Sequence, residues 1–159
     1  DAFARVAAER PHVRLLLVGG GPLHDTLAAR IRELKLDDRA LLLGERPDVA
    51  ALMKAADLLV APSLREGMSN VILEAMALGL SVLATRVGGT PEVIEDGRHG
   101  VLVDPTDTQA LADAMLQLID DPVRRQAIGQ AGRQKVLEQY SPPAMVSAML
   151  KEYSRVSQR

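Results

Sequence analysis

The sequence contains no cysteine and no tryptophan, and aromatic residues make up only 2% of it. Without cysteine, disulfide bonds and thiolate metal sites are excluded. The scarcity of aromatic side chains argues against a module that binds nucleic acid by stacking bases on them. Hydrophobic residues nevertheless account for 47% of the 159 residues. We therefore expect one folded domain whose core is built from aliphatic side chains and methionine.

Basic runs and long apolar runs are also absent. The net charge is −2, whereas a protein that binds duplex nucleic acid usually presents a basic stripe that neutralises phosphates. No apolar stretch approaches the roughly 20 residues that span a bilayer, and no secretory signal is visible. We therefore expect a cytoplasmic protein. The chain begins with Asp1 in a helix-like segment, and we expect it to be part of a longer protein.

Short apolar runs alternate with helical patterns along the chain. The patterns predict strands over 12–18, 40–43, 58–61, 81–85 and 101–103. They predict helices or helical turns over 2–10, 22–34, 48–56, 69–78, 91–95, 111–119, 122–138 and 144–156. Strands this apolar, each separated by a helix, are typical of a parallel sheet covered on both faces, which is a Rossmann-like α/β fold. The break at Ser141-Pro142-Pro143 predicts a domain over 1–140 and a separate C-terminal helix over 141–159.

The loops that follow the strands are the places to look for a ligand site, because open parallel sheets bind ligands at the carboxyl ends of their strands. These loops are 19–22, 44–47, 62–70 and 86–91. All four are rich in glycine, proline or small polar residues, which lets a ligand approach the backbone closely.

Loop 62–70 runs directly into a predicted helix, whose free N–H groups and dipole favour an anion. A phosphate could sit over residues 68–70, although an ordinary strand-to-helix turn would look the same. Glu74 lies among apolar neighbours on this helix, where a buried carboxylate is costly unless it accepts hydrogen bonds, for example from a vicinal diol. The alternative is an exposed polar stripe. Glu66 precedes Glu74 by eight residues, and this spacing alone carries no weight.

The residues around these two glutamates carry a family resemblance. The stretch from Pro62 to Gly79 reads P-S-x-x-E-G-x-x-x-V-x-L-E-A-M-A-x-G and resembles the signature of retaining glycosyltransferases of the GT-B fold, family 4. The segments 88–100 and 18–23 resemble two further motifs of that family, in the same order and spacing. The resemblance covers residues 2 to about 140.

The resemblance implies a donor site for a nucleotide-sugar, such as a UDP-sugar or GDP-sugar, with no metal. Glu66 would be the catalytic-site residue that binds the hydroxyls of the donor sugar, and Glu74 would bind the ribose. The first glycine loop and the backbone of loop 62–70 would hold sugar and phosphate through Gly20, Gly21, Gly67, Met68, Ser69 and Asn70. Backbone around Glu45 and Arg46 would contact the base.

Two parts of the family pattern are not found in the sequence. The Arg and Lys that neutralise the diphosphate have no counterpart, since Arg10, Arg14 and Lys35 do not match their positions. The acceptor-binding N-terminal domain is absent too, so we expect the chain alone to be inactive and the full-length protein to be a hexosyltransferase. A peripheral membrane association of that full-length enzyme stays open. The first strand of the sheet is also absent, so we expect a defect between 13–18 and 58–61. Segment 13–18 could close up against 58–61, another copy could donate a strand, or the missing strand belongs to a longer protein, which we favour.

Other functions remain alternatives. A dinucleotide-binding domain is disfavoured, because the glycine loop has His24 in place of the third glycine and Pro22 lacks an N–H. A GT-B epimerase or phosphorylase would share the fold, and a nucleotide-sugar-binding module without activity would share the site. We expect His12, His24 and His99 to be solvated or locally bonded, and we expect the acidic pairs 37–38 and 120–121 to be solvated loop charges.

Overall fold

The computed structural model describes residues 1–157 as five strands and eight helices. The strands are β1 (Leu15–Val18), β2 (Ala40–Gly44), β3 (Leu58–Ala61), β4 (Ser81–Thr85) and β5 (Val101–Val103). The helices are α1 (Ala2–Glu9), α2 (His24–Glu33), α3 (Val49–Ala55), α4 (Asn70–Ala77), α5 (Thr90–Val93), α6 (Thr108–Asp120), α7 (Pro122–Gln139) and α8 (Pro142–Ser157). Strands and helices alternate up to α6, and every paired strand is parallel, so the predicted α/β class is confirmed.

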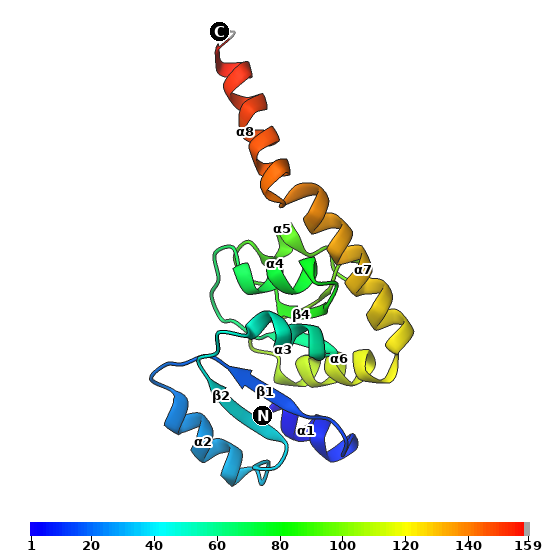
Figure 1. Cartoon of the computed structure of the whole chain (residues 1–159). Coiled ribbons are helices and arrows are strands. Elements are labelled where there is room, and N and C mark those ends of the chain that lie inside the picture. Colours follow the sequence, from blue (N-terminus) through cyan, green and yellow to red (C-terminus); the bar gives the residue numbers. More distant parts are fainter. Residues whose placement is uncertain (158–159) are drawn as a thin grey trace.

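The strands form two separate sheets (Figure 1). One holds β1 and β2, with Leu15 opposite Ala40, and the other has the order β3-β4-β5, with Leu58 opposite Ser81. No ladder joins β1 to β3 within residues 1–157. The expected defect at the centre of the sheet is therefore confirmed, and β1 does not close up against β3.

The edge of β1 that faces away from β2 is unpaired. Leu15 N donates to Arg39 O and Gly19 N donates to Gly44 O, both at 2.8 Å, on the β2 side. Successive peptide groups of a strand alternate between its two edges. The peptide groups of Leu16 and Val18 therefore point to the opposite edge, where the described chain provides no strand. The same alternation leaves half of the β3 peptide groups facing away from β4.

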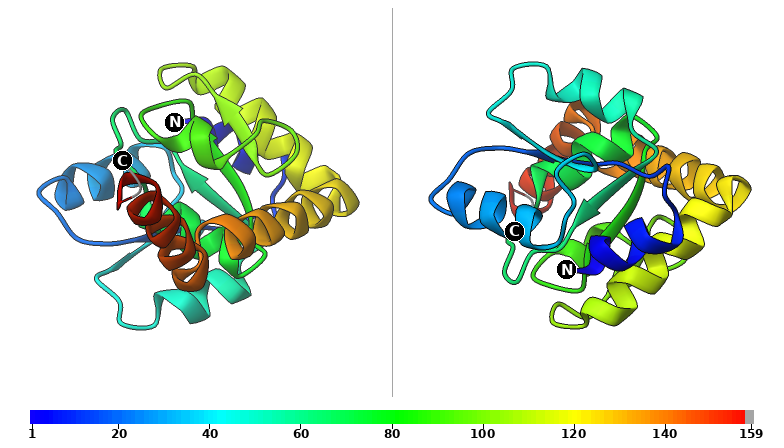
Figure 2. Two further views of the ribbon diagram at one scale, coloured as in Figure 1. Left: turned by 90° about the horizontal axis from the view of Figure 1, so that it is seen from above. Right: turned by 90° about the horizontal axis from the view of Figure 1, so that it is seen from below.

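Strand β4 lies at the centre of the buried body. All five of its residues are buried, with Leu83 in one hydrophobic cluster and Val82 and Ala84 in the other. The first cluster joins β4 to α1 and α6, and the second joins it to α4 and α7 (Figure 2). The prediction of a sheet covered on both faces is correct for β4.

The β1–β2 sheet is less well covered than the sequence predicted. Leu16 and Val18 are each 40% exposed, and α2 has no buried residue. Helix α2 therefore covers little of this sheet. Leu23, which lies within the predicted helix 22–34, is 64% exposed in a turn before α2. The reason is that α3 and α4 pack on the β3–β5 sheet, so one face of β1 is left open.

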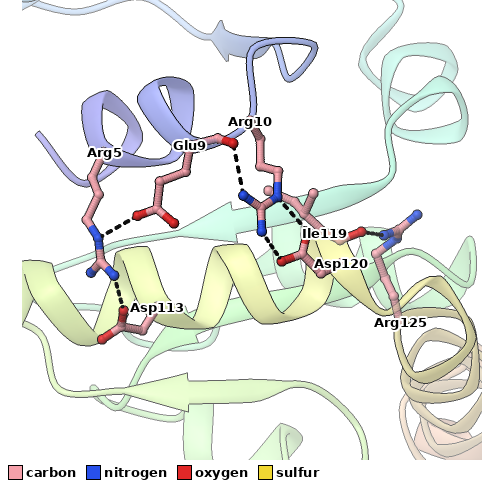
Figure 3. A network of polar contacts seen from close by, with 7 residues as sticks. All are labelled: Arg5, Glu9, Arg10, Asp113, Ile119, Asp120 and Arg125. Carbon is pink, nitrogen blue, oxygen red and sulfur yellow. Dashed lines mark hydrogen bonds and ion pairs between the residues drawn. The ribbon is translucent and has the colours of Figure 1, made fainter.

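Helix α1 is fixed to α6 by packing and by two ion pairs (Figure 3). Phe3 and Val6 are buried in the first hydrophobic cluster. Arg5 pairs with Asp113 at 2.7 Å, and Arg10 bonds both carboxylate oxygens of Asp120 at 2.7 and 2.5 Å. Solvent screens such exposed ion pairs and leaves them little net stabilisation, so apolar packing is the main attachment and the pairs fix its register.

Helix α8 projects away from the body (Figure 1). Helix α7 ends at Gln139, and α8 begins at Pro142 rather than near Ala144, because proline is tolerated in a first helical turn. The division into a domain over 1–140 and a separate helix over 141–159 stays a prediction. Five large side chains of α8 are at least 54% exposed: Met145, Val146, Met149, Leu150 and Tyr153. No helix within residues 1–157 is long and apolar enough to cross a membrane.

Candidate functional site

The first glycine loop and the loop after β2 lie against each other. Gly19 N donates to Gly44 O at 2.8 Å, and a methyl group added at Gly20 would lie 2.8 Å from Glu45 Oε1. Gly21 has a φ of 140°, a conformation that side chains rarely adopt. The structure thus brings together the residues predicted to bind phosphate and base at the end of the β1–β2 sheet.

Arg46, predicted to contact the base through its backbone, has its side chain engaged elsewhere. It forms a two-pronged pair with Asp48, with both nitrogen–oxygen distances 2.8 Å. These bonds hold the pKa of the Asp48 carboxyl below its usual value. The side chain of Arg46 is therefore a neighbour-bonded group, and its backbone is the part left for a ligand.

Loop 62–70 connects β3 to α4 and carries most of the predicted sugar and phosphate contacts. Glu66 is half-buried, and the Ser63 hydroxyl lies within hydrogen-bond distance of its Oε2, at 3.3 Å. Gly67 and Met68 are exposed. A single carboxylate is thus held in place within a loop whose backbone is open to a ligand.

The amino end of α4 is open in the way that an anion site requires. Ser69 is the N-cap residue, yet its side chain makes no capping hydrogen bond. The first backbone bond of the helix is Leu73 N to Ser69 O at 3.2 Å. Within residues 1–157 the N–H groups of Asn70, Val71 and Ile72 have no partner. Such groups, aligned with the helix dipole, favour a phosphate.

Glu74 lies one turn further along α4 and is exposed. Its neighbours Ile72, Ala75 and Met76 are buried, and in the described chain its carboxylate makes no hydrogen bond or ion pair. The desolvation argument from sequence therefore does not apply, because the carboxylate lies on the solvent side of the helix. Its assignment to a ribose stays a prediction, and its position leaves it free to accept hydrogen bonds from a ligand.

Segment 85–89 runs from the last residue of β4 toward α5 and forms hydrogen bonds to the backbone of loop 62–70. Thr85 Oγ1 donates to Ser63 O at 2.5 Å, and Gly89 N donates to Gly67 O at 2.9 Å. Sequence reasoning assigned no role to Thr85. The signal that could have found it is a polar residue that closes an apolar strand directly before a predicted ligand loop.

Several charged residues differ from the sequence-based expectation. His99 is buried at 8% exposure, so it is not solvated, and its Nδ1 makes no hydrogen bond. Its local contact is a long one, with Nδ1 lying 3.7 Å from Oε2 of Glu95. His24 does contact Asp25 at 3.2 Å. Asp120 is paired with Arg10, and Asp121 caps α7 by accepting from Arg124 N at 2.9 Å. The described residues include no group of three or more acidic or histidine side chains that could hold a metal ion.

The fold and these loops define a class of protein, namely a parallel α/β domain whose candidate ligand groups lie in the loops after its strands. A family model described as Glycosyl transferases group 1 matches residues 1–121. The chain therefore belongs to the group 1 glycosyltransferase family, and the family resemblance of its motifs is confirmed at this level.

Known proteins resemble the chain over most of its length. N-acetyl-alpha-D-glucosaminyl L-malate synthase of Bacillus anthracis is 40% identical over 147 residues, which is 92% of this chain. The structure of Anabaena Alr3699/HepE in complex with UDP matches 98% of this chain, with a TM-score of 0.83 and 30% identity. The C-terminal domain of the Francisella tularensis Glycosyl Transferase Group 1 Family Protein (LpcC) matches 89% of it, with a TM-score of 0.81 and 29% identity.

The chain accounts for only part of each of these relatives. It spans 38% of the Bacillus protein and 44% of the Anabaena chain, but 76% of the solved Francisella domain. The similarity thus concerns one part of a GT-B glycosyltransferase, and the Francisella match is a C-terminal domain.

Proposed function

We propose that this chain is the donor-binding part of a glycosyltransferase that transfers a hexose from a nucleotide-sugar to an acceptor. The observation that carries the proposal is the open amino end of α4, where three N–H groups lack partners between the carboxylates of Glu66 and Glu74 along the chain. Anion-binding N–H groups flanked by hydroxyl-binding carboxylates fit a ligand that joins a diphosphate to sugars.

Each group has a role in this arrangement. The diphosphate lies at the amino end of α4, where the helix dipole and free N–H groups stabilise its charge. Glu74 accepts hydrogen bonds from the ribose diol, and Glu66 accepts them from the donor sugar. Gly20 and Gly21 allow close backbone approach, and the backbone beside Glu45 contacts the base. Stabilising the leaving diphosphate favours cleavage of its bond to the anomeric carbon.

The relatives support this assignment. The Anabaena protein was solved in complex with UDP, and the name of the Bacillus relative specifies an alpha-linked glucosaminyl product. An alpha-linked product from an alpha-linked donor means retention, which we include in the proposal. We also include membership of family 4, a cytoplasmic location and the absence of a resident metal, on the strength of the motif resemblance.

The acceptor site belongs to another part of the protein in this proposal. The chain spans 38% of the Bacillus relative, and we propose an acceptor-binding N-terminal domain as its partner. A GT-B epimerase fragment or a binding module without activity would share the donor site. Transfer to an acceptor by the longer protein separates the transferase from both.

Protein-observed NMR with a panel of UDP-sugars and GDP-sugars tests the donor site. We expect the amide signals of residues 66–74 to shift for the correct donor, with smaller shifts for the wrong base. Amide signals of α6, which lies away from these loops, provide the internal control. If no nucleotide-sugar at millimolar concentration moves the signals of 66–74, the proposal is wrong.

A further inference from the structure

We propose that Thr85 and Gly88 are positioning residues that hold Glu66 where it meets the donor sugar, and thereby set the preference for a nucleotide-sugar over its bare nucleotide. The inference rests on the proposed function. Neither residue lies in loop 62–70, and neither carries a group predicted to touch the donor. Their effect is transmitted through the backbone of the loop.

Thr85 connects the loop to β4, the strand whose residues are all buried. It is 2% exposed and ends this strand. Its hydroxyl donates to Ser63 O at 2.5 Å and lies 3.4 Å from Ala61 O. Ser63 in turn presents its own hydroxyl to Glu66 at 3.3 Å. A chain of contacts thus runs from β4 to the carboxylate of Glu66.

Gly88 and Gly89 support the backbone of the same loop. Gly88 has a φ of 51°, and a methyl group added there would lie 1.6 Å from the carbonyl oxygen of Glu66. At Gly89 a methyl group would lie 2.9 Å from the carbonyl oxygen of Gly67, which also accepts the Gly89 N–H. The backbone of Glu66 and Gly67 therefore rests directly on two residues that have no side chain, and any side chain at 88 must push Glu66 away.

Glu66 and Glu74 are positioned independently of each other. Glu74 is carried by α4, which is anchored by the buried side chains of Ile72 and Met76, and none of the contacts made by segment 85–89 reaches it. A displacement of about 1 Å is enough to spoil a recognition geometry. Disturbing Thr85 or Gly88 should therefore impair recognition of the sugar more than recognition of the nucleotide.

Calorimetric titration of the 159-residue chain tests this separation. The ligands are UDP with UDP-glucose and GDP with GDP-mannose, and the pair that the unmodified chain binds is used. In Gly88→Ala we expect the ratio of the nucleotide Kd to the nucleotide-sugar Kd to fall about tenfold, as for loss of one hydrogen bond to a charged group, while the nucleotide Kd changes about threefold or less. Gly97→Ala is the matched control, because Gly97 also has a positive φ of 76° but has no atom near an added methyl.

Thr85 variants give a second test that adds no bulk next to Glu66. Thr85→Val removes the hydroxyl and keeps the shape, so it should lower the same ratio, whereas Thr85→Ser keeps the hydroxyl and should restore it. These variants decide the question if Gly88→Ala does not fold. Amide spectra without ligand should show shifts at Glu66 and Gly67 in both disturbing variants.

Three results would overturn the inference. The variants could weaken binding of nucleotide and nucleotide-sugar equally, or leave the ratio of the two Kd values unchanged, or Thr85→Ser could lower that ratio as much as Thr85→Val does. Failure of the proposed function looks different, because then the unmodified chain binds none of the nucleotide-sugars in the UDP and GDP panel; where the panel identifies another sugar, that conjugate and its bare nucleotide replace the pairs named above. In that case the inference falls together with the proposed function.

Discussion

Glu66 and Glu74 stand eight residues apart, yet their surroundings differ. Glu66 is half-buried and approached by a serine hydroxyl, whereas Glu74 is exposed on α4. Glu66→Ala should weaken binding of a nucleotide-sugar more than binding of its bare nucleotide. Glu74→Ala should weaken binding of both ligands. Each loss should be about 1.5–3 kcal/mol, the contribution of a hydrogen-bonding group that carries charge. Titration calorimetry with the nucleotide and its sugar conjugate measures both; equal losses for the two ligands in the Glu66 variant would refute its assignment to the sugar.

His99 should make the stability of the fold depend on pH. Burial, with Lys135 and Arg98 nearby, holds the pKa of its imidazole below the usual 6.5. The unfolded chain therefore binds a proton more readily than the folded chain, so the contribution of neutral His99 is present above pH 6.5 and is lost as the pH falls through the lowered pKa. Thermal unfolding between about pH 7.5 and 5.5 should show a falling Tm. This fall in Tm should be smaller in His99→Gln, whereas in the exposed control His12→Gln it should equal that of the unmodified chain. The same dependence of Tm on pH in all three proteins would count against this role of His99.

Sequence reasoning reached the identity of these residues but not their exposure. The motif around Glu66 and Glu74 was visible in the chain itself. Whether Glu74 points inward depends on which face of α4 the rest of the fold covers. The sequence left a buried carboxylate and an exposed polar stripe open, and the exposed stripe is the one observed. The burial of His99 and the support from Thr85 arise from contacts between distant segments, which no local pattern contains.

At the scale of elements, strand boundaries were the most predictable feature. The bounds of β3, β4 and β5 agree with the sequence prediction, because each is a short apolar run closed by a glycine, proline or polar residue. The start of α2 was wrong, because Pro22 lies in a turn rather than in the first helical turn. The poor cover over β1 could not be predicted from its apolar sequence. An apolar side chain indicates that burial is favourable, but it does not show whether another element packs on it.

Helix α8 should be loosely held. Met145, Met149 and Tyr153 recur at helical spacing and are exposed, so this face lacks a partner in the chain described. Amide exchange across 144–156 should be rapid in a dilute sample, whereas the buried part of α7 around Ile128 and Val136 should exchange slowly and serves as the control. Protection that rises with protein concentration would indicate docking on another copy. Slow exchange in a dilute monomer would contradict the prediction.

At the scale of the whole molecule, the chain alone should bind a donor without turning it over. Catalysis requires donor and acceptor to be held together and the charge of the leaving diphosphate to be offset. The family's Arg and Lys pair has no counterpart here, and no acceptor site is assigned to these residues. A sensitive product assay with the purified chain and a range of acceptors should remain at background. Transfer above that of a Glu66→Ala control would overturn the expectation.

The gap between β1 and β3 should accept a strand from a longer protein. An unpaired peptide group costs about 1–3 kcal/mol where it is buried, against a net stability of about 5–15 kcal/mol for a domain, and less where water reaches it. A chain extended before Asp1 by an apolar strand and its connection to α1 should therefore unfold at a higher temperature than residues 1–159. An extension of equal length rich in glycine and proline provides the control. No difference between the two, or slow exchange of the Leu16 and Val18 amides in the unextended chain, would show that the edge is already satisfied.

The division of the strands places the two ends of the proposed donor site on different sheets. The loops predicted to meet the base and the first phosphate contacts follow β1 and β2, whereas the carboxylates predicted to bind sugar and ribose follow β3. A donor that touches both sets must bring them into one geometry, and a strand seated between them does the same. Two events that favour the same arrangement are thermodynamically linked, and the coupling is reciprocal. A strand bound in the gap should therefore increase the affinity for the donor by a certain factor, and the donor should increase the affinity for the strand by the same factor.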